Sequence, residues 1–72
     1  MKLPRDVSGA EAVRALERMG FSVTRQVGSH VRLRNGPKCV TVPLHRSLAP
    51  GTLQGILRQA ATTLADFLNA LR

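Results

Sequence analysis

Apolar side chains recur at helical spacing near the start of the chain. Ser8 followed by Glu11 is typical of a capping box, in which each side chain accepts from the other residue's backbone amide. Gly20 favours the left-handed conformation that ends many helices, so a helix is predicted between these points. Its apolar residues form one stripe: Ala12, Val13, Leu16 and Met19. Residues 3–7 are predicted to be extended, since Pro4 disfavours a helix.

The next segments alternate polar and apolar residues in the manner of β-strands. Residues 21–27 are predicted to be the first strand, with three apolar residues on one face: Phe21, Val23 and Val27. Gly28-Ser29 interrupts this run, and residues 30–35 then alternate with a period of two. Val31 and Leu33 are therefore predicted to face the core. The opposite face carries polar side chains: His30, Arg32 and Arg34.

A hairpin turn at Asn35-Gly36 is predicted to lead into a third strand over residues 39–42. Pro43 ends the sheet, and residues 44–49 form a loop. That loop carries two residues of interest: His45 and Arg46.

Two helices are predicted in the remainder of the chain. Pro50-Gly51-Thr52 begins the first, whose apolar stripe is Leu53, Ile56 and Leu57. Gly55 within it is expected to lie where another backbone approaches. After a break over residues 60–62, Thr63 and Asp66 predict the N-terminus of a short last helix. Its inward-facing residues are Leu64, Phe67, Leu68 and Leu71.

The predicted order is helix, three-stranded antiparallel sheet, helix and short C-terminal helix, within one α+β domain spanning residues 1–72. With a basic surface, this order fits the topology of double-stranded-RNA-binding domains. Topology alone does not establish an activity.

The charge of the chain indicates its partners. Eleven Lys and Arg against four Asp and Glu give a net charge of +7 on 72 residues, which favours a phosphate polymer or an acidic partner. A ribosomal or membrane-surface protein would have the same balance, so charge does not indicate an activity. No apolar run is long enough to span a bilayer, and a single cysteine suits a reducing cytoplasm. A soluble cytoplasmic protein is expected.

Few side chains are suited to catalysis. The four acids form no pair placed for acid–base work or Mg²⁺ binding, and most of them are explained as helix caps or helix-face charges. Cys39 is expected to be a small packed residue without activation. With one cysteine and two histidines well apart, no spacing resembles a zinc site. Neither a metal ion nor a cofactor is expected.

His30 is the strongest candidate among the remaining residues. It follows a Gly-Ser turn, and strand alternation aligns it with Arg32 and Arg34. Histidine ordinarily has a pKa near neutrality, so an imidazole can accept and donate a proton at cellular pH. Such a base could remove the ribose 2′-OH proton while guanidinium groups stabilise the charge that develops on the phosphate. The residues alone leave a non-catalytic RNA-binding module open as the alternative.

The lack of exposed aromatic residues constrains how RNA is bound. The chain has no Tyr or Trp, and Phe21 and Phe67 are both predicted core residues. Base stacking is therefore not available to it. Contacts should involve phosphate, 2′-OH and shape, with weak sequence preference.

Motifs spread along nearly the whole chain are shared with one family: Leu3-Pro4, Ser8-Gly9, Gly20-Phe21, Arg25-Gln26-Val27-Gly28-Ser29-His30, Val42-Pro43-Leu44-His45, Pro50-Gly51-Thr52-Leu53, Ile56-Leu57-Arg58-Gln59-Ala60 and Phe67. In this combination they resemble the HicA family of toxins from bacterial type II toxin–antitoxin pairs. Each motif alone is weak, whereas Gly-Ser-His with Val-Pro-x-His and Gly-Thr-Leu is specific. The chain departs from the family in its short hairpin at residues 35–38 and in Ala61, where a glycine is usual.

The resemblance implies a double-stranded-RNA-binding-like fold and an mRNA-cleaving ribonuclease of the bacterial cytoplasm that needs neither the ribosome nor a metal ion. It implies that His30 is the catalytic histidine. A HicB-type antitoxin is expected to cover His30, with DNA contacted only indirectly through the antitoxin and no membrane involved. A toxin-derived subunit that has lost its activity is a further alternative.

The helper residues are less determined than His30. Candidate phosphate contacts are the basic residues Arg25, Arg32, Arg34 and Arg46. Ser29 either binds phosphate or shapes the turn. His45 also matches a family position, and either bonds to backbone near the end of the sheet or serves as a second proton-transfer group or phosphate contact.

Overall fold

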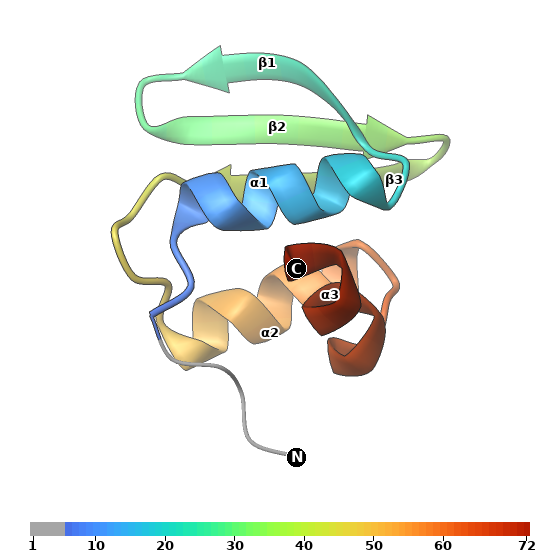
Figure 1. Ribbon diagram of the computed structural model, residues 1–72. Helices are drawn as coiled ribbons and strands as arrows, with labels where there is room; N and C mark the ends of the chain where they lie inside the picture. Colours follow the sequence, from blue (N-terminus) through green and yellow to red (C-terminus); the bar gives the residue numbers. More distant parts are fainter. Residues whose placement is uncertain (1–5) are drawn as a thin grey trace.

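The computed structural model describes residues 6–72 and has the predicted α+β order (Figure 1). Residues 3–5 of the predicted extended lead-in lie outside the described residues. The elements are α1 Gly9–Arg18, β1 Ser22–Val27, β2 His30–Asn35, β3 Lys38–Pro43, α2 Pro50–Gln59 and α3 Leu64–Leu71. The strands form one antiparallel sheet in the order β1-β2-β3.

Helix α1 begins and ends as predicted. The Ser8 hydroxyl accepts from the Glu11 amide at 3.0 Å, and the Glu11 carboxylate accepts from the Ser8 amide at 3.1 Å. At the other end Gly20 has a φ of 100°, and the amides of Gly20 and Phe21 donate back to carbonyl groups of the last turn. This motif satisfies the final carbonyls and turns the chain into β1.

Both hairpins have two-residue turns. In the first, Gly28 takes a φ of 58°. In the second, Asn35 pairs with Lys38, so the turn residues are Gly36 and Pro37, one residue later than predicted. The reason is conformational: Gly36 has a φ of 61°, and Pro37 supplies a fixed negative φ next to it.

The prediction that Val23 and Val27 share a face of β1 is wrong. The register of β1 against β2 shifts by one residue after Val23, which lies opposite Leu33, whereas Val27 lies opposite His30. Directly opposite residues of an antiparallel pair share a face, so this β-bulge moves Val27 to the side of His30. Both valines remain exposed, Val23 by 44% and Val27 by 53%.

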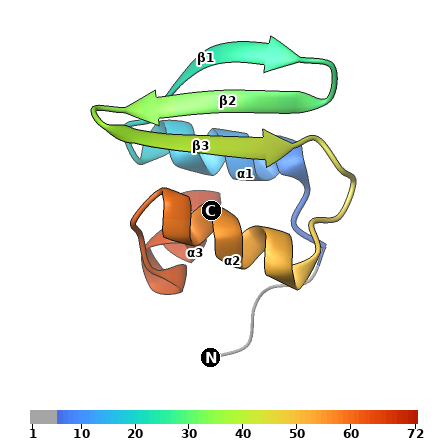
Figure 2. The same cartoon turned by 180° about the vertical axis from the view of Figure 1, so that it is seen from behind.

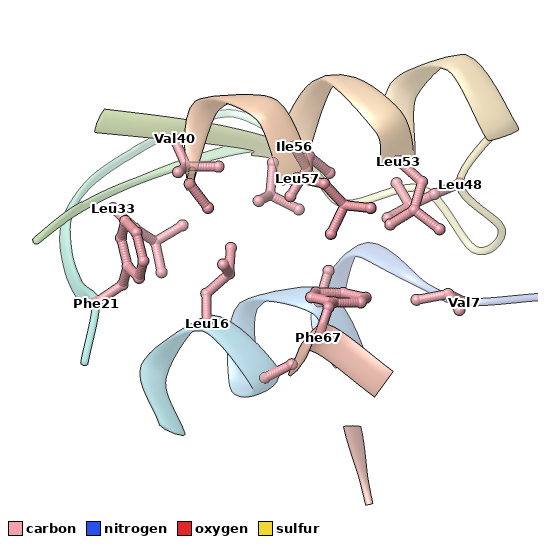
Figure 3. Close-up of a cluster of buried hydrophobic side chains, with 14 of the residues drawn as sticks. Val7, Leu16, Phe21, Leu33, Val40, Leu48, Leu53, Ile56, Leu57 and Phe67 are labelled. Atoms are coloured by element: carbon pink, nitrogen blue, oxygen red, sulfur yellow. The ribbon is translucent and has the colours of Figure 1, made fainter. Parts of the chain in front are cut away.

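Helices α1 and α2 contact the sheet, and one of its faces is crossed by no described helix (Figures 1 and 2). Helix α1 covers one face of the sheet, here called the inner face. Helix α2 lies beside β3, and α3 packs against α1. Figure 3 shows the buried side chains that meet between these layers. The largest fully buried ones are Leu16, Leu33, Val40, Val42, Leu53, Ile56 and Phe67.

Helix α2 ends with the same motif as α1, but with an alanine at the left-handed position. Ala61 has a φ of 53°, and the amides of Ala61 and Thr62 donate to the carbonyls of Arg58 and Leu57. A Cβ built on Gly55 would meet nothing within 4 Å. The expectation that another backbone approaches Gly55 is therefore wrong.

Helix α3 is fastened at both ends. The Thr63 hydroxyl accepts from the Asp66 amide at 3.1 Å, as predicted. The Arg18 guanidinium of α1 donates to the carbonyl oxygens of Ala70 at 2.6 Å and Arg72 at 3.1 Å. These bonds hold the C-terminus of α3 against α1. Among residues 6–72, no helix has the length and apolar character needed to cross a membrane.

Candidate functional site

Two backbone hydrogen bonds gather three segments at one end of the molecule. The Leu44 amide donates to the Ser29 carbonyl at 2.6 Å, which joins the loop after β3 to the turn between β1 and β2. The Gly9 amide donates to the His45 carbonyl at 2.9 Å, which joins the same loop to the start of α1. His30 follows Ser29 and His45 follows Leu44, so this bond brings both histidines to one end of the sheet. Figure 1 shows the turn between β1 and β2 and the loop after β3 at that same end.

Gly9 makes this junction possible because it has no side chain. A Cβ at Gly9 would collide with the Pro43 carbonyl oxygen and lie 2.7 Å from the Leu44 Cα. Real Cβ atoms essentially never make backbone contacts this short. The position of the His45 loop therefore depends on a glycine in the first turn of α1.

His30 lies at the start of β2 on the sheet face that the helices leave open, here called the outer face. The predicted alternation of β2 is confirmed, since Val31 and Leu33 are buried and His30 is exposed. Its neighbours across the sheet are Val27 of β1 and Pro43 of β3. The imidazole is therefore open to solvent between two apolar side chains.

Three of the four arginines predicted to bind phosphate occupy the next two rows of the outer face. Arg25 lies opposite Arg32, and Arg32 lies opposite Thr41. Arg34 follows one row further from His30, opposite Cys39. These side chains line an open hollow of about 630 Å³ that does not include His30. His30 and these arginines therefore occupy successive rows of the outer face, and the hollow begins one row from His30.

The acidic residues all lie away from this face. Within residues 6–72 they sit in the segment before α1, on α1 and on α3: Asp6, Glu11, Glu17 and Asp66. Hydrogen bonds from the Ser8 backbone amide and then the Ser8 side chain hold the pKa of Glu11 below its ordinary value of 4.5. Among the described residues, no three or more His, Cys, Asp and Glu side chains come together as metal ligands.

The predicted site residues fall into two groups. Ser29, His30, His45 and Arg46 are exposed at the loop end of the sheet, whereas the other three arginines lie along the outer face: Arg25, Arg32 and Arg34. Arg34 is the furthest from His30 and donates to the Gly36 carbonyl at 3.3 Å.

The expectation that Cys39 is packed is wrong, because its side chain is exposed on the outer face. Cys39 precedes Val40, and strand alternation gives the core position to Val40 instead.

Three residues on or beside the outer face were not identified from the sequence as part of it: Val27, Thr41 and Gln59. Thr41 could have been found from strand alternation, since it lies between the core residues of β3. Gln59 of α2 accepts from the Thr41 amide at 3.2 Å and so occupies the free edge of β3. No local sequence signal indicates that contact, nor the bulge that brings Val27 beside His30.

Comparison with known proteins assigns the family of this chain. Residues 9–61, which run from the first residue of α1 to the end motif of α2, match the family described as HicA toxin of bacterial toxin–antitoxin. No curated protein matches the chain. The match includes the Gly-Ser-His turn, the outer face and the His45 loop, and it covers well over half of the chain. The chain therefore belongs to the HicA family of toxins from bacterial toxin–antitoxin systems.

Proposed function

We propose that the protein is an endoribonuclease toxin that cleaves mRNA in the bacterial cytoplasm, with His30 as its acid–base group, independently of the ribosome and of metal ions. The observation that carries the proposal is the exposure of His30 on the outer face, one row from the Arg25–Arg32 pair. Membership of a toxin family supports it.

The chemistry uses the 2′-OH of the substrate. His30 accepts the 2′-OH proton, the 2′ oxygen forms a bond to the adjacent phosphorus, and the bond from phosphorus to the 5′ oxygen breaks. The protonated imidazole then returns the proton to the 5′ oxygen. The products are a 2′,3′-cyclic phosphate and a 5′-hydroxyl, and the protein is unchanged. DNA has no 2′-OH and is not a substrate.

The basic side chains stabilise the phosphate as its charge increases. Arg46 and Ser29 lie with His30 at the loop end of the sheet and are proposed to contact the cleaved phosphate. Arg25, Arg32 and Arg34 are proposed to bind neighbouring phosphates. His45, tied to the start of α1 by its carbonyl oxygen, has two proposed roles: a second proton-transfer group or a phosphate contact.

The proposed protein partner is a HicB-type antitoxin that covers His30. The cationic outer face favours an acidic surface on that partner. Its binding would exclude RNA by occupying the same guanidinium groups. Any contact with DNA would be made by the antitoxin.

The deciding experiment compares the wild-type chain with His30→Ala on a labelled RNA in the presence of a chelator. The proposal predicts that wild type cuts the RNA and that His30→Ala does not, while the variant keeps the circular dichroism spectrum and the RNA affinity of wild type. His30 is exposed, so folding should be retained. The alternative, a non-catalytic RNA-binding module, predicts that neither protein cuts and that both bind.

A further inference from the structure

Two neighbouring arginines on the outer face, Arg25 and Arg32, destabilise the fold when no anion is bound between them. Arg25 and Arg32 lie directly opposite each other on adjacent strands. Like charges in this arrangement destabilise a sheet. Every acidic residue of the chain lies outside this face, so no carboxylate offsets the repulsion there. An anion bound between the two guanidinium groups would offset it.

The shape of the face around this pair fits an extended polyanion. Rows of the sheet are two residues apart along β2, which corresponds to about 6.6–6.8 Å. His30, Arg32 and Arg34 therefore mark a line of about 13 Å along one strand. Phosphates of one strand are about 3.4 Å apart along the axis of a duplex and further apart in an extended strand, so this line can hold more than one phosphate. The hollow lined by the three arginines covers the Arg32–Arg34 part of that line and is bordered by Gln59 of α2. No described helix crosses the outer face of the sheet (Figure 2).

Helix α1, on the helical side of the molecule, offers little net charge to a duplex. The exposed charges of α1 cancel, since Glu11 and Glu17 accompany Arg14 and Arg18, and Arg18 is already bonded to the C-terminus of α3. Double-stranded-RNA-binding domains span about 16 base pairs, on the order of 50 Å of duplex. The backbone of this molecule extends over 30 Å along its longest principal axis.

The geometry points to a binding track for an unpaired RNA strand along the outer face, with the phosphate to be cut beside His30 and the following phosphates on the Arg25–Arg32 pair and Arg34. This inference rests on the proposed ribonuclease function. It adds that the bound RNA is unpaired and that the strand runs along the outer face. Attack by the 2′ oxygen in line with the departing 5′ oxygen requires a nucleotide that can leave the A-form geometry. An unpaired strand meets that requirement.

Binding measured on His30→Ala tests the track separately from cleavage. The probes are a labelled 12-nucleotide oligouridine, which stays unpaired, and an RNA duplex of the same length. We expect Arg25→Gln or Arg32→Gln to weaken oligouridine binding by about three- to tenfold. Each should also make the slope of log affinity against log salt shallower by about 0.7. Arg14→Gln on α1 and Arg58→Gln on α2 remove the same charge and should leave the slope unchanged.

Thermal stability supplies an independent readout. Without RNA, Arg25→Gln should raise the melting temperature by about 2–4 °C, because the like-charge pair is removed. Tighter binding of the duplex than of oligouridine, or equal effects of the Arg14 and Arg25 variants on binding, would overturn the track. If acidic peptides bind through these arginines but RNA does not, the track is also overturned. RNA cleavage is measured separately on the chain that retains His30. The proposed ribonuclease activity and the proposed binding track can therefore fail independently.

Discussion

The Leu44 amide donates to the Ser29 carbonyl oxygen at 2.6 Å, and this bond ties the loop of His45 to the turn of His30. The loop is held from its other side by the bond between the Gly9 amide and the His45 carbonyl at 2.9 Å. Residues from three separate parts of the sequence thus fix one end of the outer face.

Gly9→Ala tests this junction. The added methyl group would overlap the Pro43 carbonyl, so α1 and the end of β3 must separate. We expect a loss of about 1–3 kcal/mol in the free energy of unfolding, measured by urea denaturation. Cleavage of RNA should fall as well, because the same methyl group would displace Leu44 and with it the loop that carries His45. Gly55→Ala is the matched control: its Cβ meets nothing within 4 Å, and replacing a helical glycine should stabilise the protein by about 1 kcal/mol. Equal effects of the two substitutions would contradict the close approach at Gly9.

Ala61→Gly should stabilise the protein. Ala61 has a φ of 53°, a conformation that costs an alanine roughly 1–2 kcal/mol and a glycine very little. Glycine also gains freedom in the unfolded chain, so we expect a net increase of about 0.5–1 kcal/mol in the free energy of unfolding. Ala60→Gly is the control, since Ala60 is buried with a right-handed conformation and should lose stability. A less stable Ala61→Gly protein would show that the methyl group of Ala61 makes a compensating contact.

The capping box predicts a pH dependence. The pKa of Glu11 is lowered in the folded protein by its bonds with Ser8, so the ionised form favours folding. This stabilisation is complete above the ordinary value of 4.5 and is lost as the pH falls through the lower folded pKa. Glu11→Gln should therefore be less stable than wild type near neutral pH, and the difference should shrink below pH 4.5. The urea midpoints of both proteins, measured across this pH range, check this prediction. A difference between them that does not change with pH would contradict stabilisation by the ionised Glu11 carboxylate.

Helix α3 lies beyond the matched family segment, yet its Phe67 is fully buried (Figure 3). Phe67→Ala should cost about 3–5 kcal/mol in the free energy of unfolding, because the cavity left is in the centre of the core. In a chain of 72 residues this removes most of the stability. Asn69→Ala, an exposed position of the same helix, should change stability by no more than about 0.5 kcal/mol. A small effect of Phe67→Ala would mean that α3 is dispensable.

Local sequence signals predicted the order of elements and most of their ends. The Ser8–Glu11 pair, Gly20 and the Thr63–Asp66 pair act through bonds between residues close in sequence, so their structures follow from residue type. The outward position of His30 likewise follows from alternation along β2.

Features that depend on contacts between distant segments were not predicted. The bulge that moves Val27 beside His30 is a property of how two strands pair, and spacing within β1 alone predicted the wrong face. The contact of Gln59 with the Thr41 amide joins residues 18 positions apart. The exposure of Cys39 was missed because residue type favoured burial, whereas its position in the strand directs it outward.

The most direct test of the central claim is the chemistry of the cut ends. An RNA oligonucleotide is incubated with the wild-type chain, and the products are identified by mass spectrometry; a second oligonucleotide carries one 2′-deoxy substitution at the mapped cleavage position. Attack by the 2′-OH under His30 acid–base catalysis predicts a 2′,3′-cyclic phosphate with a 5′-hydroxyl on the first RNA, and no cut at that position in the second. Products with 5′-phosphate ends, or cleavage at the deoxy position, would contradict it.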